Sequence, residues 1–190
     1  SALLIAEEGD GLHDFLGQID RVGRRLGWSG ADVLDLALHP SIQTARDALR
    51  ASLEAGRALT VFSGHSSPTV WGFRSLLTPG TAAALTNQGR PTIAVPLACE
   101  TTYDVSPSAN VLGHQLLYAG DRGALAISGA VSLSGLQENE RMAAHVLEGL
   151  AAGLTLGEAV QAGREALGAT HRELLDNWVT QGDAALRLER

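Results

Sequence analysis

The sequence predicts an α/β fold, in which helices pack on the faces of a mostly parallel sheet. Apolar runs of strand length alternate with longer segments of helical periodicity along the chain. Gly, Pro, Ser and Asp mark the joins between them. With 190 residues, of which 45% are hydrophobic and 18% charged, the chain has enough apolar side chain for one core. We therefore expect a single domain over residues 1–190.

Three strands and two helices are expected in the first part of the chain. The strands are Ala2–Glu7, Asp32–Leu38 and Ala58–Phe62. Apolar residues at helical spacing predict a helix over Leu12–Leu26, which the Gly-Trp-Ser-Gly break at Gly27–Gly30 ends. A second helix begins at Pro40-Ser41 and closes at Gly56, since glycine is favoured just past a helix end.

The second part of the chain repeats this alternation. The loop-rich span 66–90 holds a short helix at Thr81–Leu85, and further strands are expected at Thr92–Ala98, Gly123–Leu133 and, as a short final strand, Ala185–Leu188. The expected helices run from Ser106-Pro107 to Gly120, over Leu136–Leu150 and from Thr155 to Leu167. Thr155 and Glu158 have the spacing of a capping box, in which each residue satisfies a free backbone N–H of the other.

Charge and composition exclude several classes of function. The formal net charge of −7 and the pI of about 5.3 argue against non-specific nucleic-acid binding and against docking to an anionic membrane. The apolar runs are too short to span a bilayer, so no membrane insertion is expected. All 14 basic residues are arginine, which excludes a Schiff-base lysine. The chain begins at Ser1 without a signal peptide, so we expect a domain of a longer protein.

Neither a metal nor a cofactor is expected from the sequence. The single cysteine excludes an intrachain disulfide and a cysteine-rich zinc site. No calcium-binding motif is found. The other histidines have no partners at metal-ligand spacing and are interpreted as surface or core groups: His13, His39, His114, His145 and His171.

Two reactive side chains each follow an expected strand. Cys99 follows Thr92–Ala98, and His65 follows Ala58–Phe62. Because the carboxyl ends of parallel strands meet at one edge of a sheet, this thiol and this imidazole can form a pair for nucleophilic catalysis. Glu8 comes after the first strand, at the same edge. The alternative for Cys99 is a buried structural role, since free cysteine is among the most buried residue types.

Residues near this pair are candidates for binding a substrate. The backbone N–H groups of Ser66 and Cys99 are candidate oxyanion donors. Gly64 allows a sharp turn before the histidine. Trp71, with Gly72, is a candidate wall of a substrate cleft, and a core or lid anchor is an equal alternative for it.

A set of short segments follows in order along nearly the whole chain: Ser63–Gly72, Leu85–Asn87, Ala98–Thr101, Gly123–Ile127, Thr155–Ala159, Leu174–Trp178 and Gly182–Leu186. In this order and at this spacing, they resemble the gingipain family of cysteine peptidases (peptidase family C25), which are relatives of the caspases. A lone Gly-His or Ala-Cys pair would be a weak signal, whereas the ordered set is specific.

The resemblance implies a caspase-like three-layer α/β/α sandwich and cysteine endopeptidase activity through a thioester acyl-enzyme. It makes Cys99 the nucleophile, His65 the catalytic histidine and Glu8 the acid that orients the histidine. In the family, this unit is half of a larger catalytic region. The expected partners are therefore other parts of a longer precursor and a protein or peptide substrate. The family also implies secretion or display at the cell surface, without excluding the cytoplasm.

The resemblance also bears on substrate preference. Arginine-specific members of the family carry an acidic residue at the base of the pocket for the substrate residue before the cleaved bond (P1). Asp14 is the best match and Asp20 is a rival. Because a carboxylate pairs bidentately with a guanidinium group, Arg at P1 is expected if either residue faces the cleft. A solvated helix charge is the alternative for both.

Two positions depart from the family pattern. Ser66 stands where the family has glycine after the histidine, and its side chain narrows the oxyanion site. Ala184 replaces the proline of a Gly-Asp-Pro turn. The alternative function is therefore a catalytically weak or inactive caspase-like scaffold that acts by interaction. A small-molecule hydrolase is disfavoured, because the sequence has no Gly-x-Ser-x-Gly elbow.

Overall fold

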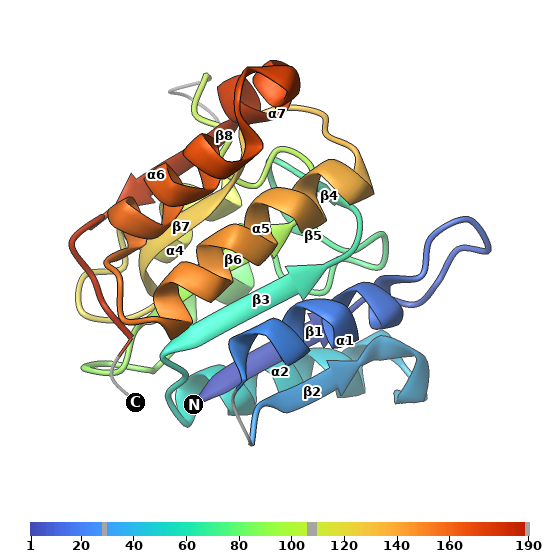
Figure 1. Cartoon of the computed structure of the whole chain (residues 1–190). Coiled ribbons are helices and arrows are strands. Elements are labelled where there is room, and N and C mark those ends of the chain that lie inside the picture. The colour runs from blue at the N-terminus through green and yellow to red at the C-terminus, as the bar shows by residue number, and fades with distance from the viewer. Residues whose placement is uncertain (28–29, 106–109, 189–190) are drawn as a thin grey trace.

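The centre of the fold is a six-stranded sheet with the strand order β2-β1-β3-β6-β7-β8. The computed structural model describes residues 1–27, 30–105 and 110–188 (Figure 1). The strands are β1 (Ala2–Ala6), β2 (Asp32–Asp35), β3 (Leu59–Ser63), β6 (Thr92–Leu97), β7 (Ala124–Ala130) and β8 (Trp178–Gly182). Neighbours pair in parallel except β7 and β8, which are antiparallel. A separate hairpin pairs β4 (Ser66–Ser67) with β5 (Val70–Trp71).

Helices cover both faces of the sheet, as the sequence predicts (Figure 1). One face carries α1 (Phe15–Leu26), α5 (Leu136–Ala151) and α6 (Leu156–Leu167). The other carries α2 (Ile42–Glu54), α3 (Pro79–Ala83) and α4 (Leu112–Leu117). A short α7 (Arg172–Asn177), which the sequence pattern does not predict, leads into β8. The predicted fold class, a three-layer α/β/α sandwich with a mostly parallel sheet, is confirmed.

The inner strands carry continuous apolar runs because both of their faces are buried. In β1, Leu4 and Ala6 join the core beneath α1, α5 and α6, whereas Leu3 and Ile5 join the core on the opposite face. β3 and β6 are buried along their whole length. The sheet is therefore a rigid base for the loops that leave its strand ends.

Local capping contacts begin the helices, and α1 begins at Phe15 rather than at the predicted Leu12. Asp14 accepts a backbone hydrogen bond within the first turn of α1. Ser41 and Thr44 form a capping box at the start of α2. Thr155 and Glu158 form the predicted capping box at the start of α6. Such contacts involve neighbours in sequence, which is why the sequence reveals them.

The second strand is shorter than predicted. β2 ends at Asp35, whose carboxylate accepts a hydrogen bond from the Ala37 N–H at 3.0 Å. This contact turns the chain into a short 3-10 helix at Leu36–Leu38. An aspartate side chain that competes for backbone N–H groups thus ends a strand that the apolar alternation extends further.

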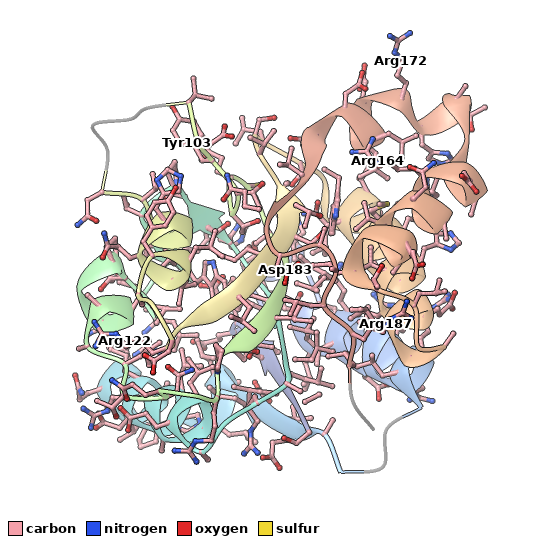
Figure 2. All side chains as sticks on the ribbon, turned by 90° about the vertical axis from the view of Figure 1, so that its left-hand side faces the viewer. Tyr103, Arg122, Arg164, Arg172, Asp183 and Arg187 are labelled. Carbon is pink, nitrogen blue, oxygen red and sulfur yellow. The ribbon has the colours of Figure 1, made fainter. Side chains whose placement is uncertain are left out.

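The last strand lies earlier in the chain than predicted. It is β8 (Trp178–Gly182), and residues 185–188 form no strand. Trp178 is fully buried, and its ring N–H donates to Ser128 Oγ on β7 at 2.8 Å. Arg164 on α6 donates to the Trp178 carbonyl oxygen at 2.7 Å, on the side of the molecule that Figure 2 presents. Contacts with β7 and α6, rather than a local pattern, therefore fix the final strand.

Two expectations fall partly outside the described ranges. They concern Trp28-Ser29 in the predicted helix break, and Ser106-Pro107 at the predicted start of the helix observed as α4. Gly27 does end α1, in the left-handed conformation with a φ of 59°. Within the described ranges, no helix combines the length and the apolar character that a membrane crossing needs.

Candidate active site

The ends of neighbouring parallel strands form the candidate active site. β1 and β3 pair Ala6 with Ser63, and β3 and β6 pair Ser63 with Leu97. The segments that follow these three residues therefore leave the sheet at one edge. They carry both His65 and Cys99, as the sequence predicts.

Aromatic rings and a carboxylate hold the half-buried His65 side chain. The imidazole stacks on the Phe73 ring, with centroids 3.9 Å apart and planes inclined by 23°. The Phe15 ring meets the imidazole edge-on at a centroid distance of 5.2 Å. Nε2 of His65 lies 2.9 Å from Oδ2 of Asp10. A carboxylate oxygen accepts, so the neutral ring carries its proton on Nε2 and leaves the Nδ1 lone pair free.

Asp10 is bound by two histidines and by two backbone groups. Its Oδ2 atom lies 2.8 Å from Nδ1 of His13 and 2.9 Å from Nε2 of His65. Its Oδ1 atom accepts hydrogen bonds from the N–H groups of Leu12 and His13. The bonds with His13 and then His65 hold the pKa of Asp10 well below its usual range. Asp10 is therefore ionised at neutral pH and orients both rings.

The carboxylate at His65 is not the one that the family resemblance implies. Glu8 is exposed, and its carboxylate lies 3.6 Å from the guanidinium of Arg74. Glu7 is buried directly before it, so the chain turns Glu7 inward and Glu8 outward. Asp10 takes the place at His65 expected of Glu8. The signal for Asp10 in the sequence is its position between two glycines, which indicates a turn. Aspartate in a turn accepts hydrogen bonds from backbone N–H groups that follow it.

Glu7 is a buried carboxylate that joins the loops on both sides of the histidine. It accepts hydrogen bonds from the His65 N–H at 2.6 Å and from the Phe73 N–H at 2.5 Å. Glycine is needed beside it. A Cβ atom at Gly64 would lie 2.8 Å from Oε2 of Glu7, and Gly72 has a φ of 78°. Glu7 thereby fixes the backbone that presents His65 and its stacking partner.

The half-buried Cys99 thiol has a different set of partners. Its S–H donates to the carbonyl oxygen of Ser134 at 3.4 Å, and the Ser134 hydroxyl lies 3.8 Å from the sulfur. Asn139 on α5 donates to that hydroxyl at 2.9 Å. Across the described residues, no hydrogen bond joins the thiol to His65. The two side chains thus share an edge of the sheet but are not directly paired.

The backbone at Cys99 is held from both sides. The N–H of Glu100, which has a left-handed φ of 53°, donates to the carbonyl oxygen of Ser132 at 3.0 Å. The Ser66 hydroxyl donates to the carbonyl oxygen of Cys99. Within the described part of the chain, the Cys99 N–H has no acceptor. This N–H is therefore available to a ligand.

Trp71 belongs to the core, which agrees with the second of its two interpretations. It is 3% exposed, and its ring stacks on Phe62 with centroids 5.0 Å apart. Phe73, by contrast, is 75% exposed and lies against His65. Phe73 has no signal in the sequence, because an isolated phenylalanine in a loop forms no pattern.

A pocket of about 450 Å³ lies beside this site. Its lining includes His13, Asp14 and Asp35. Asp14 is exposed, and its carboxylate also caps α1 by accepting a hydrogen bond from the Gly17 N–H. Asp20 does not line this pocket and pairs with Arg24 on the same helix. Of the two acidic residues that the resemblance suggests, Asp14 is therefore the one next to His13, which shares the Asp10 carboxylate with His65.

Residues 24–189 match the family model described as Peptidase family C25. A comparison with curated protein sequences gave no match.

Solved structures of similar fold were also found. The crystal structure of the Arg specific cysteine proteinase gingipain R (RgpB) has a TM-score of 0.80 and 19% identity, covering 98% of this chain and 47% of that chain. A complex of Porphyromonas gingivalis RgpB pro- and mature domains has a TM-score of 0.77 and 19% identity, covering 97% and 47%. A structure described as "Structure of Protease" has a TM-score of 0.72 and 17% identity, covering 98% and 47%. This chain thus spans about half the length of each.

Proposed function

Since the chain belongs to peptidase family C25, we propose that it is a cysteine endopeptidase with Cys99 as nucleophile and His65 as base and acid. The observation that carries the proposal is the placement of both residues after the paired strands β3 and β6, at one edge of the sheet. Asp10 supports it, because its carboxylate fixes the tautomer and the orientation of His65.

The first step is activation of the thiol. The Cys99 S–H leaves the Ser134 carbonyl oxygen and turns toward the imidazole. Nδ1 of His65 accepts the proton, because Nε2 already carries one toward Asp10. The thiolate attacks the carbonyl carbon of the substrate and forms a C–S bond.

The next steps release both halves of the substrate. The imidazolium gives its Nδ1 proton to the leaving amine as the C–N bond breaks, and a thioester remains on Cys99. His65 then takes a proton from a water molecule, whose oxygen attacks the thioester. The sulfur leaves and recovers its proton from His65, which restores the starting state.

The oxyanion formed during attack is stabilised by the backbone N–H groups of Cys99 and Ser66. The Cys99 N–H, which has no acceptor among the residues that the structure describes, supports this assignment. The Ser66 hydroxyl bonds the Cys99 carbonyl oxygen and so steadies the backbone that carries this donor.

Arg is the proposed P1 residue, and Asp14 its carboxylate partner. The pocket beside His13 supports this, because Asp14 and Asp35 both line it and a carboxylate matches the fork of a guanidinium group. One solved structure of similar fold is described as Arg specific. Another is a complex of pro- and mature domains, so other parts of a longer precursor are proposed partners.

Fluorogenic peptides that differ only at P1, with Arg, Leu or Glu, test the proposal. We expect cleavage after Arg, none by Cys99→Ala, and a weaker preference for Arg in Asp14→Asn, with Asp20→Asn as the matched control. The alternative, a scaffold without activity, is favoured by one observation, the thiol bonded to Ser134 rather than to His65. It would be supported if no peptide were cleaved and no acyl-ketone inhibitor labelled Cys99.

A further inference from the structure

Three metal-binding atoms converge beside the proposed dyad. They are Oδ2 of Asp10, Nδ1 of His13 and Nε2 of His65, which all lie within 4.8 Å of one another. Asp10 and His13 belong to the segment between β1 and α1, whereas His65 follows β3. The two histidines are far apart in sequence, so ligand spacing does not reveal the cluster.

We propose that Asp10, His13 and His65 bind a divalent transition-metal ion such as Zn²⁺, and that bound metal inactivates His65. Imidazole nitrogen with one carboxylate oxygen is a donor set that suits Zn²⁺. Ca²⁺ and Mg²⁺ prefer ligands that are all oxygen.

The geometry of the cluster is close to that of such a site. Ligands of Zn²⁺ lie about 2.0–2.2 Å from the metal, so tetrahedral ligand atoms are separated by about 3.3 Å. The distances from Asp10 Oδ2 to the two histidine nitrogens are 2.8 Å and 2.9 Å. Opening each of these two pairs by about half an ångström, with the two histidine nitrogens brought from within 4.8 Å of one another to about 3.3 Å, admits the metal. Asp10 is exposed, which leaves the fourth position open to water.

Contacts outside the three ligands hold them in place. The N–H groups of Leu12 and His13 bind Oδ1 of Asp10 and leave Oδ2 directed at the rings. The His13 ring stacks on Phe15 with centroids 5.6 Å apart, and the His65 ring stacks on Phe73 at 3.9 Å. Little conformational freedom is lost on binding, and such outer contacts are known to raise metal affinity.

Metal bound at this site would block the proposed catalytic step without any bond to Cys99. This part of the inference rests on the proposed function. A metal ion on Nε2 displaces its proton, so the neutral His65 ring carries its proton on Nδ1 instead. Nδ1 then has no lone pair with which to accept the thiol proton. The binding itself does not depend on any peptidase activity.

Titration with CoCl₂ and ZnCl₂ tests the binding. We expect one ion per chain, with the visible absorption of four-coordinate Co²⁺ lost on addition of Zn²⁺. His13→Ala and the polar His13→Gln are each expected to weaken binding by more than the roughly 10–100-fold that loss of an outer contact costs. His145→Ala is the matched control, and Cys99→Ala is expected to bind as the wild type does. Unchanged binding in both His13 variants, or loss of binding in Cys99→Ala, would overturn the site.

Alkylation of Cys99 by iodoacetamide tests the consequence for His65. We expect Zn²⁺ to slow alkylation of the wild type at least tenfold and to leave His13→Gln at its own metal-free rate. Equal slowing in both proteins would overturn the inhibition, and so would the absence of slowing in a wild type that binds the metal. This readout needs no substrate. A chain that binds Zn²⁺ but cleaves no peptide would therefore contradict the proposed function and leave the metal site intact.

Discussion

The histidine side and the cysteine side of the site are held in different ways. On the histidine side, the carboxylates of Glu7 and Asp10 and the Phe73 ring bind both the backbone and the imidazole of His65. On the cysteine side, the backbone of Cys99 is fixed, but among the described residues its sulfur makes only two hydrogen bonds, of 3.4 Å and 3.8 Å, both with Ser134. Sulfur is a weak hydrogen-bonding group. The imidazole is thus preorganised, and the thiol is the part that must move for the two to meet.

Loss of either reactive side chain should have the largest effect. If the residues act as a dyad, Cys99→Ala and His65→Ala each lower kcat/KM on the order of 10⁴-fold or more. The double variant should then have the same kcat/KM as the slower single variant, because once one residue of the pair is gone the other no longer contributes to catalysis. Progress curves with an Arg peptide provide the measurement. Losses that multiply in the double variant would mean that the two residues act independently.

Asp10→Asn tests the preorganisation of the imidazole. The amide can donate to Nε2, which favours the tautomer with the proton on Nδ1, so we expect kcat to fall about 10²-fold. KM should change little, since Asp10 orients His65 rather than the substrate. Glu8→Gln is the control, because Glu8 pairs with Arg74. A larger loss in Glu8→Gln than in Asp10→Asn would restore Glu8 as the orienting acid.

Glu7→Ala tests how the backbone on the histidine side is held. Removing this buried carboxylate leaves the N–H groups of His65 and Phe73 without their acceptor. We expect the free energy of unfolding to fall by about 2 kcal/mol in urea titrations. Glu8→Ala should change it by about 0.5 kcal/mol or less, since its partner is an exposed arginine. If Glu7→Ala also lowered the free energy of unfolding by only about 0.5 kcal/mol or less, the buried Glu7 carboxylate would stabilise the fold little.

Ser134→Ala tests the freedom of the thiol. The substitution removes the hydroxyl near the Cys99 sulfur but keeps the Ser134 carbonyl oxygen, which accepts the hydrogen bond from the thiol. Because contacts of sulfur are weak, we expect the rate of Cys99 alkylation by iodoacetamide to change by no more than about threefold. A change of a hundredfold would mean that Ser134 holds the thiol firmly, and the contrast between the two sides would fail.

The smallest effect concerns pH. The pKa of Asp10 is lowered in the folded chain from an ordinary value of 3.8. The stabilisation from its ionised form is therefore fully present above that value and is lost as the pH falls below it. We expect the difference in unfolding free energy between the wild type and Asp10→Asn to shrink below about pH 4. Urea titrations across this range measure it, and a difference that grew in acid would contradict the assignment.

Much of the fold could be predicted from the sequence because its signals are local. Buried strands, helical periodicity and the capping box at Thr155 depend on near neighbours, and the resemblance to family C25 agrees with the match over residues 24–189. The partners of His65 could not be predicted in the same way. Asp10 and Phe73 reach it through folded loops, and the strand at Trp178 depends on β7.

The contact of Glu7 with two glycines has a consequence for how such sequences can diverge. A side chain at Gly64 would collide with the Glu7 carboxylate, and Gly72 combines a left-handed backbone with a contact to the same group. None of these positions can change alone without disturbing the histidine loop. Related chains should therefore retain the glutamate and both glycines together or replace all three at once. The three positions are expected to covary.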